Sequence, residues 1–124
     1  MYVKNIYFAF LSIFLLNSCN YDNEESLYGI SDCDTNFVSF EMDINPIISS
    51  NCKSCHVGEY PAGDILLETY DQISLVADDS SQRGIVYVIT RPEGDPDLMP
   101  KGYRLTQCEI DKIIAWKEQG LLNN

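Results

Sequence analysis

An all-α fold is predicted for this chain of 124 residues, for three reasons. Thr69 and Thr106 each begin a capping box, a pattern that starts helices, and each is followed by apolar side chains at helical spacing. Pro46 stands where the first turn of a helix tolerates proline. The one run with strand-like composition, residues 84–90, has no second such run to pair with.

The first predicted helix starts near Pro46, with Asp43 or Asn45 as its cap, and runs directly into Cys52. Its apolar face consists of isoleucines three and four positions apart, namely Ile44, Ile47 and Ile48. The second helix follows the capping box of Thr69 and Gln72. Its apolar stripe is Ile73, Val76 and Ala77.

Residues 84–90 (GIVYVIT) have the β-branched and aromatic composition of a strand, but without a partner strand we interpret them as a short third helix. Ser80 or Ser81 could cap it, and Arg91-Pro92 would end it. The last helix follows the capping box of Thr106 and Glu109 and stops at Gly120. Its buried face is predicted to contain Ile110, Ile113, Ile114 and Trp116.

The most informative motif is Cys52-Lys53-Ser54-Cys55-His56. Two thiols at this spacing can form thioether bonds to one porphyrin, and the adjacent imidazole can ligate its iron. The motif therefore predicts one covalently bound haem c, with His56 as an axial ligand. Two other interpretations are a redox dithiol and half of a zinc site, although the chain has no second histidine to complete a zinc site.

A second axial ligand is predicted at Met99. With a single histidine the chain cannot supply two imidazoles, and methionine is the next candidate. Met99 lies in a loop rich in proline and glycine, without the helical periodicity of a core residue. Met42, which precedes the first helix, is interpreted as a packing residue. The alternatives for Met99 are a structural role or an open iron site.

The N-terminal segment resembles the signal of a bacterial lipoprotein. Lys4 precedes an apolar run, residues 6–16, that is too short for a spanning helix. Leu16-Asn17-Ser18-Cys19 is similar to a lipobox, which implies cleavage before Cys19 and acylation of its thiol. The alternative is ordinary signal cleavage that leaves a free thiol. By analogy, Asn20 after the cysteine favours the outer membrane, and the protein would face the periplasm or the cell surface.

Cysteine counting then predicts a disulfide. If Cys19 is acylated and Cys52 and Cys55 hold haem, Cys33 and Cys108 are the remaining pair in an oxidising compartment. Their bond would close a loop of about 76 residues. For a loop of this length the chain-entropy model gives a stabilisation of the folded state of roughly 4 to 5 kcal/mol. The alternative is two buried free thiols.

We predict three segments: a signal peptide (1–18), an acidic linker after lipidated Cys19 (19–35) and one domain (36–124). The chain carries 19 acidic and 8 basic side chains, a net charge of −11. Such a charge argues against nucleic acid as a partner and favours redox partner proteins with basic docking surfaces. Acidity that serves only solubility is an equal alternative.

The chain resembles the small class I-like cytochrome c domains of exported bacterial lipoproteins, over roughly residues 33–120. The matching pieces are Cys33-Asp34-Thr35, Asn51 to His56, Leu67 to Tyr70, Met99 to Gly102, Leu105 to Ile110 and Ile114 to Trp116. The resemblance implies three to four helices around haem c, axial ligation by His56 and Met99, and electron transfer. After His56 the segment is shorter than in longer cytochromes, and a carbonyl near Pro61 is expected to orient the imidazole.

The expected function is that of a mono-haem, membrane-tethered electron carrier and not of an enzyme. A haem peroxidase or ligand sensor is the first alternative, and it would need a labile sixth position on the iron. A zinc or structural lipoprotein without haem is the second.

Overall fold

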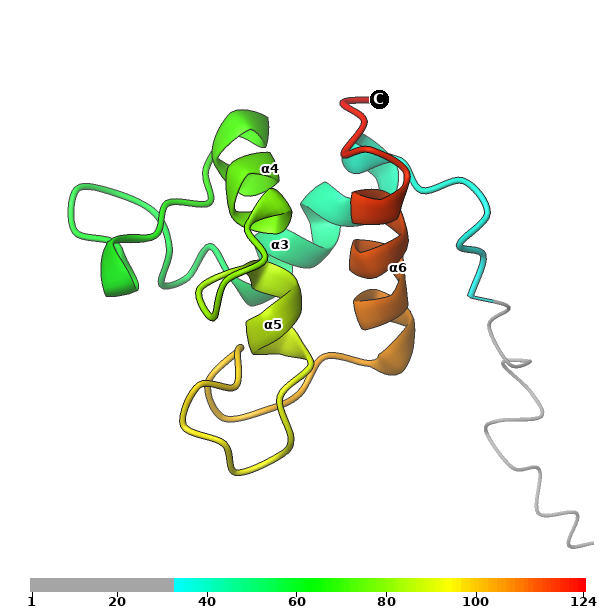
Figure 1. Cartoon of the computed structure of the whole chain (residues 1–124). Helices are drawn as coiled ribbons and strands as arrows, with labels where there is room; N and C mark the ends of the chain where they lie inside the picture. Colours follow the sequence, from blue (N-terminus) through cyan, green and yellow to red (C-terminus); the bar gives the residue numbers. More distant parts are fainter. Residues whose placement is uncertain (1–32) are drawn as a thin grey trace, which may run out of the picture. The chain divides into compact units, whose positions relative to one another are not determined.

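A computed structural model describes residues 33–124, which consist of helices and loops, without a strand among these residues. The predicted all-α class is thus confirmed for this part of the chain (Figure 1). In chain order the elements are a π-helical turn η2 (Phe40–Ile44), α3 (Asn45–Asn51), a 3-10 turn η3 (Ala62–Asp64), α4 (Tyr70–Asp78), α5 (Ile85–Ile89) and α6 (Gln107–Glu118). The predicted signal peptide and Cys19 lie outside the described residues.

The first helical segment begins earlier than predicted. Its cap is Ser39, whose side chain accepts a hydrogen bond from the backbone N–H of Met42 at the start of η2. The carboxylate of Asp43 instead accepts from the backbone N–H of Ser39 at 3.0 Å and from Lys112 on α6 at 2.6 Å. Neither Asp43 nor Asn45 caps α3, because the chain is already helical when it reaches Pro46.

Both predicted capping boxes are present. The Thr69 side chain caps α4 with Gln72 as its reciprocal partner, and Thr106 caps α6 with Glu109. Gly120 ends α6 with a φ of 91°, a left-handed conformation that glycine adopts without strain. Its N–H donates to the carbonyl of Lys117 and the next N–H, of Leu121, donates to that of Trp116, which makes a Schellman motif.

Residues 85–89 form helix α5, as predicted, but neither Ser80 nor Ser81 caps it. A tight turn comes first: the Asp79 carboxylate accepts from the N–H of Ser81 at 2.7 Å, and the N–H of Gly84 reaches the Ser81 carbonyl at 3.1 Å. Gly84 is the N-cap. A Cβ on this residue would lie 1.9 Å from the Asp79 carbonyl oxygen, so the turn leaves room only for glycine.

The core lies where η2, α4 and α6 meet. Phe40 packs edge-on against Tyr70, with ring centroids 5.0 Å apart, and lies 5.5 Å from Trp116. Trp116 is fully buried, and its indole N–H donates to the Leu122 carbonyl at 2.9 Å. The same buried cluster contains the isoleucines Ile44, Ile48, Ile73, Ile89, Ile110 and Ile113. Helices α3, α4, α5 and α6 thus form one body, from which the loops after α3 and α5 extend (Figure 1).

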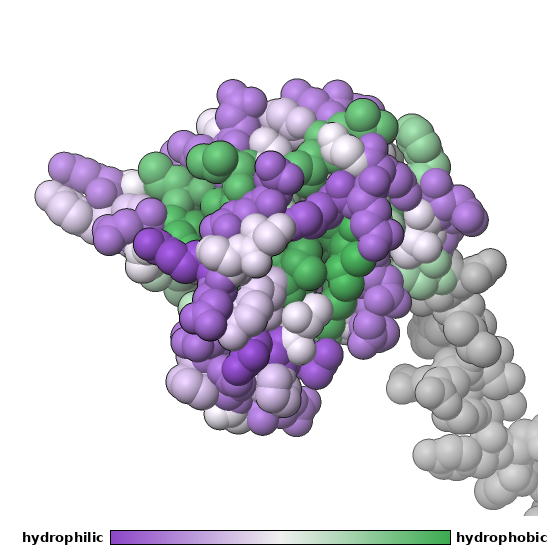
Figure 2. Space-filling view, in the orientation of Figure 1, coloured by the Kyte–Doolittle hydropathy of each residue, from purple (hydrophilic) through white to green (hydrophobic). Residues whose placement is uncertain are grey.

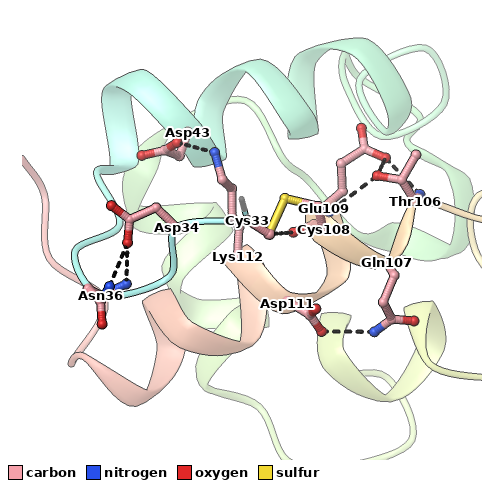
Figure 3. Close-up of a disulfide and its surroundings, with 10 residues drawn as sticks. All are labelled: Cys33, Asp34, Asn36, Asp43, Thr106, Gln107, Cys108, Glu109, Asp111 and Lys112. Carbon is pink, nitrogen blue, oxygen red and sulfur yellow. Dashed lines mark hydrogen bonds and ion pairs between the residues drawn. A yellow bond between two sulfur atoms is a disulfide. The ribbon is translucent and has the colours of Figure 1, made fainter. Parts of the chain in front are cut away.

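A disulfide joins Cys33 to Cys108 in the first turn of α6, with a Cα–Cα distance of 5.5 Å. The predicted pairing is therefore present (Figure 3). Lys112, one helical turn after Cys108, reaches Asp43, so two links join the start of the unit to the same helix.

Hydrophobic side chains also reach the surface, as Figure 2 shows on one face of the molecule. The large ones are Phe37, Met42, Val57, Tyr60, Leu75, Tyr103 and Leu122. Met42 was expected to pack in the core, but 77% of it is exposed because it lies on the outer side of η2. Within residues 33–124, no helix has the length and apolar character needed to cross a membrane.

Candidate functional site

A cavity of about 530 Å³ lies between α3, α5 and the two long loops. Such a volume falls in the usual range for small-molecule and cofactor sites, about 300 to 1,000 Å³. Cys52, Cys55, His56 and Met99 all line it. The rest of its wall is largely aliphatic and includes Ile65, Leu67, Val76, Ile85, Val88 and Ile89. The structure thus brings the four sequence-predicted residues to one apolar cavity.

The cysteines and the histidine reach the cavity from a turn that continues α3. Cys52 is the C-cap of α3, and its N–H donates to the Ile48 carbonyl. The N–H groups of Cys55 and His56 then both donate to the Cys52 carbonyl at 3.1 Å. Because both N–H groups bind the same carbonyl, the backbone forms a tight turn here, and the two thiols and the imidazole line one cavity.

His56 is held in one orientation by the loop that follows. Its Nδ1 lies 3.1 Å from the backbone carbonyl oxygen of Ile65, and a carbonyl can only accept a hydrogen bond. The Nδ1 atom therefore carries the proton of a neutral ring, which leaves Nε2 as the free donor for a metal. A carbonyl from the region of Pro61 was expected to orient the ring, and the one that does so belongs to Ile65, four residues further along the same loop. The Pro61 carbonyl itself accepts from the N–H of Asp64.

The same loop is fixed to the motif at two further points. The N–H of Ala62 donates to the Cys55 carbonyl at 2.9 Å, and that of Leu67 donates to the His56 carbonyl at 2.8 Å. Leu67 is buried in the core. The loop therefore anchors the imidazole to the folded body on the side opposite the turn.

Met99 reaches the cavity from the loop between α5 and α6. Its N–H donates to the carbonyl of Val88 in α5 at 3.1 Å. Within the loop, Arg91 and Asp95 form an ion pair of 2.5 Å. The hydrogen bond from Arg91 is the main cause of the lowered pKa of Asp95. Leu98, the preceding residue, is buried. Met99 is thus attached to a helix and held by an ordered loop.

The two thiols differ in environment. Cys55 is exposed, whereas burial, with a smaller contribution from the Glu109 carboxylate, raises the pKa of Cys52 to about 11. A redox dithiol needs a thiolate at neutral pH, and such thiols have lowered pKa values. The raised pKa of Cys52 argues against this thiol as the nucleophile of a disulfide exchange.

A zinc site finds little support in the described residues. The disulfide occupies Cys33 and Cys108, the two cysteines that could have completed it. Between residues 33 and 124, no three His, Cys, Asp or Glu side chains are close enough together to hold a metal ion. The donor set at the cavity, thioether sulfur and imidazole with two further thiols, fits haem iron and covalent attachment better.

Several residues of the cavity wall were not predicted as site residues. Asn51, Lys101 and Ile65 carried no motif of their own, although Asn51 adjoins the Cys-Lys-Ser-Cys-His motif and Lys101 adjoins Met99-Pro100. Arg83 also lines the cavity, and its Nη2 donates to the Gly63 carbonyl at 2.7 Å.

Comparison of the chain with models of known protein families, with curated proteins and with solved structures found no match. The arrangement of residues around the cavity is therefore the basis for assigning a function.

Proposed function

We propose that this protein is a mono-haem c-type cytochrome that acts as an electron carrier. One haem c would be attached through Cys52 and Cys55, with His56 and Met99 as the axial ligands of its iron. When bound, haem supplies a reversible one-electron couple that the protein side chains lack.

One observation carries the proposal: the two thiols, the imidazole and the thioether line a single apolar cavity. Cys52, Cys55 and His56 follow one helix, while Met99 comes from a loop more than forty residues further along the chain. Methionine in a polar loop is ordinarily exposed or fills a gap in a core. Here its backbone is bonded to α5, and the side chain lines the cavity that the histidine also lines.

The protein residues would have separate tasks. Thioether links from Cys52 and Cys55 would retain the group in either oxidation state. The carbonyl of Ile65 would accept the hydrogen bond from Nδ1 and so orient the His56 ring, with Nε2 free for the iron. The aliphatic part of the wall would limit the contact of the group with water, and a methionine ligand together with a largely apolar site favours a relatively high potential.

Electron transfer is favoured over the alternative of a haem peroxidase or ligand sensor. Both of these need a sixth iron position that is vacant or readily vacated. The Met99 loop is fixed by its bond to Val88 and by the Arg91–Asp95 ion pair. A ligand on such a loop would keep its place during oxidation and reduction, which suits a carrier.

The proposal includes the compartment and the partners. A protein acylated at Cys19 would be tethered in the cell envelope by its lipid chains. By analogy with lipoprotein sorting rules, this would be the outer membrane of a bacterium, with the protein facing the periplasm or the cell surface. Its net charge of −11 would direct it toward redox partners with basic docking surfaces.

Visible absorption spectroscopy tests the proposed function. The protein would be produced in a host able to attach haem, purified, and measured in oxidised and reduced forms. We expect the spectrum of a low-spin, six-coordinate haem. A high-spin spectrum would favour the peroxidase or sensor, and a colourless protein would favour the zinc or structural lipoprotein.

A further inference from the structure

The wall of the cavity carries two basic side chains, Arg83 and Lys101. They come from different segments: Arg83 from the turn between α4 and α5, and Lys101 from the loop that holds Met99. Both residues are exposed, so their charged ends lie at the rim and not among the aliphatic side chains of the interior.

Neither cation forms an ion pair within residues 33–124. The guanidinium of Arg83 donates to the Gly63 carbonyl, and the ammonium of Lys101 donates to the Pro96 carbonyl. The two ion pairs in this part of the chain are Arg91 with Asp95 and Lys112 with Asp43. Arg83 and Lys101 are thus each hydrogen-bonded to a neutral carbonyl oxygen, and neither charge is compensated by a carboxylate in direct contact.

This charge arrangement is unusual for so acidic a chain. The protein carries 19 acidic side chains, yet Asp97 alone contributes a carboxylate to the cavity wall. The other polar side chains of the wall are uncharged, namely Asn51, Ser54, Gln82 and Tyr103, apart from the predicted haem-binding residues. The rim therefore has an excess of positive charge beside an apolar interior.

Such a cavity fits a ligand that is apolar over most of its area and carries carboxylates at its edge. On the basis of the proposed function, we propose that Arg83 and Lys101 bind the propionate carboxylates of the haem. Arg83 would exchange or share its bond to Gly63, and Lys101 its bond to Pro96, for charge-assisted hydrogen bonds to the carboxylates. Each cation would offset the negative charge beside the iron.

Replacement of each cation by glutamine tests the assignment. In Arg83→Gln and Lys101→Gln the carboxylate loses its counter-charge, which favours the oxidised, more positive iron. The midpoint potential, measured by spectroelectrochemistry at constant pH and salt, should shift downward in each variant and most in the double variant. The carboxylate stretching bands in the redox-induced infrared difference spectrum should shift as well.

Arg104→Gln is the matched control. Arg104 is an exposed residue three positions after Lys101, it does not line the cavity, and it forms no ion pair within the described residues. Arg104→Gln changes the net charge of the protein by the same amount as Arg83→Gln or Lys101→Gln. Its midpoint potential therefore measures the effect of losing a positive charge that does not line the cavity. Arg83→Lys and Lys101→Arg should restore most of the lost potential, because they keep the charge.

Two failures can be told apart. A wild-type protein that carries no haem would overturn the proposed function and this assignment with it. If the wild type carries haem but Arg83→Gln and Lys101→Gln shift the potential no more than Arg104→Gln does, the assignment alone is overturned. The same conclusion follows if Arg83→Lys lowers the potential as much as Arg83→Gln, since the effect would then come from the lost Gly63 contact.

Discussion

The hydroxyl of Tyr103 donates a hydrogen bond to the Asn51 side-chain oxygen at 2.9 Å. Tyr103 lies four residues after Met99, and Asn51 directly precedes Cys52, so this bond links the two segments that supply the predicted ligands. The amide nitrogen of Asn51 in turn donates to the Ile47 carbonyl at 2.9 Å and to Glu109 at 3.3 Å. Both segments are thereby joined to α6, which contains Glu109.

The first prediction concerns this link. Tyr103→Phe removes the hydroxyl while leaving the ring, and should cost about 0.5 to 1.5 kcal/mol of unfolding free energy, measured by urea denaturation. In the haem-loaded protein, Met99 should also be displaced from iron at a lower denaturant concentration. Tyr60→Phe is the control, because the Tyr60 ring is 88% exposed and its hydroxyl reaches only the neighbouring Glu59. Equal stability of the two variants would contradict a role for the link.

Met99→Ala should remove the thioether while leaving haem attachment through Cys52 and Cys55 intact. We expect a lower midpoint potential, since a methionine ligand raises it, and binding of small ligands such as cyanide or imidazole at the vacated position. Met42→Ala provides a control, because 77% of Met42 is exposed on η2, away from the cavity. A potential and spectrum unchanged by Met99→Ala would exclude Met99 as a ligand.

Loss of the disulfide should lower stability without changing the haem site. The double variant Cys33→Ser/Cys108→Ser should lose about 2 to 5 kcal/mol of unfolding free energy, measured by denaturant titration. Its absorption spectrum should match that of the wild type, because neither cysteine lines the cavity. Peptide mapping without reductant provides an independent check: a digest that lacks a Cys33–Cys108 cross-linked peptide would refute the pairing.

The Asp43–Lys112 ion pair predicts a pH dependence of stability. The hydrogen bond from Lys112 lowers the pKa of Asp43 from its ordinary value of 3.8, so the folded state favours the carboxylate. The resulting stability is fully present above the ordinary pKa and is lost as pH falls through the lowered one. Asp43→Asn should therefore cost about 1 kcal/mol at pH 7, and the difference from the wild type should disappear in strong acid.

Urea unfolding at pH 7 and below pH 3 measures both values. Asp78→Asn is the control, because the Asp78 carboxylate is exposed and forms no ion pair within residues 33–124. A stability difference for Asp43→Asn that stays constant across this pH range would contradict the assigned role of its charge.

The parts of the fold that the sequence predicted are those with local causes. Thr69 and Thr106 start helices through side chains only three residues away, and Gly120 ends α6 through its own φ. The lack of a pairing partner was enough to assign residues 85–89 to a helix. The four predicted cavity residues could be identified from their chemistry, because the Cys-Lys-Ser-Cys-His motif and a methionine in a polar loop have few other functions.

The errors arose where contacts outside the helix-capping patterns decide the structure. The π-helical turn η2 is held by Asn124, whose side chain and backbone accept from the N–H groups of Phe40 and Glu41. Gly84 replaces a serine cap because the Asp79 carbonyl approaches too closely for any Cβ. The carbonyl that faces the His56 ring belongs to Ile65 and not to Pro61 itself, because of the path that the loop takes between them. No local pattern in the sequence encodes these three contacts.

The central claim is that haem is covalently bound through Cys52 and Cys55, and intact mass spectrometry under denaturing conditions tests it most directly. The wild-type chain and the variant Cys52→Ser/Cys55→Ser would be produced together with haem-attachment machinery. After allowance for the substitutions, we predict that the wild type is heavier by the mass of one haem. Equal masses would contradict the account.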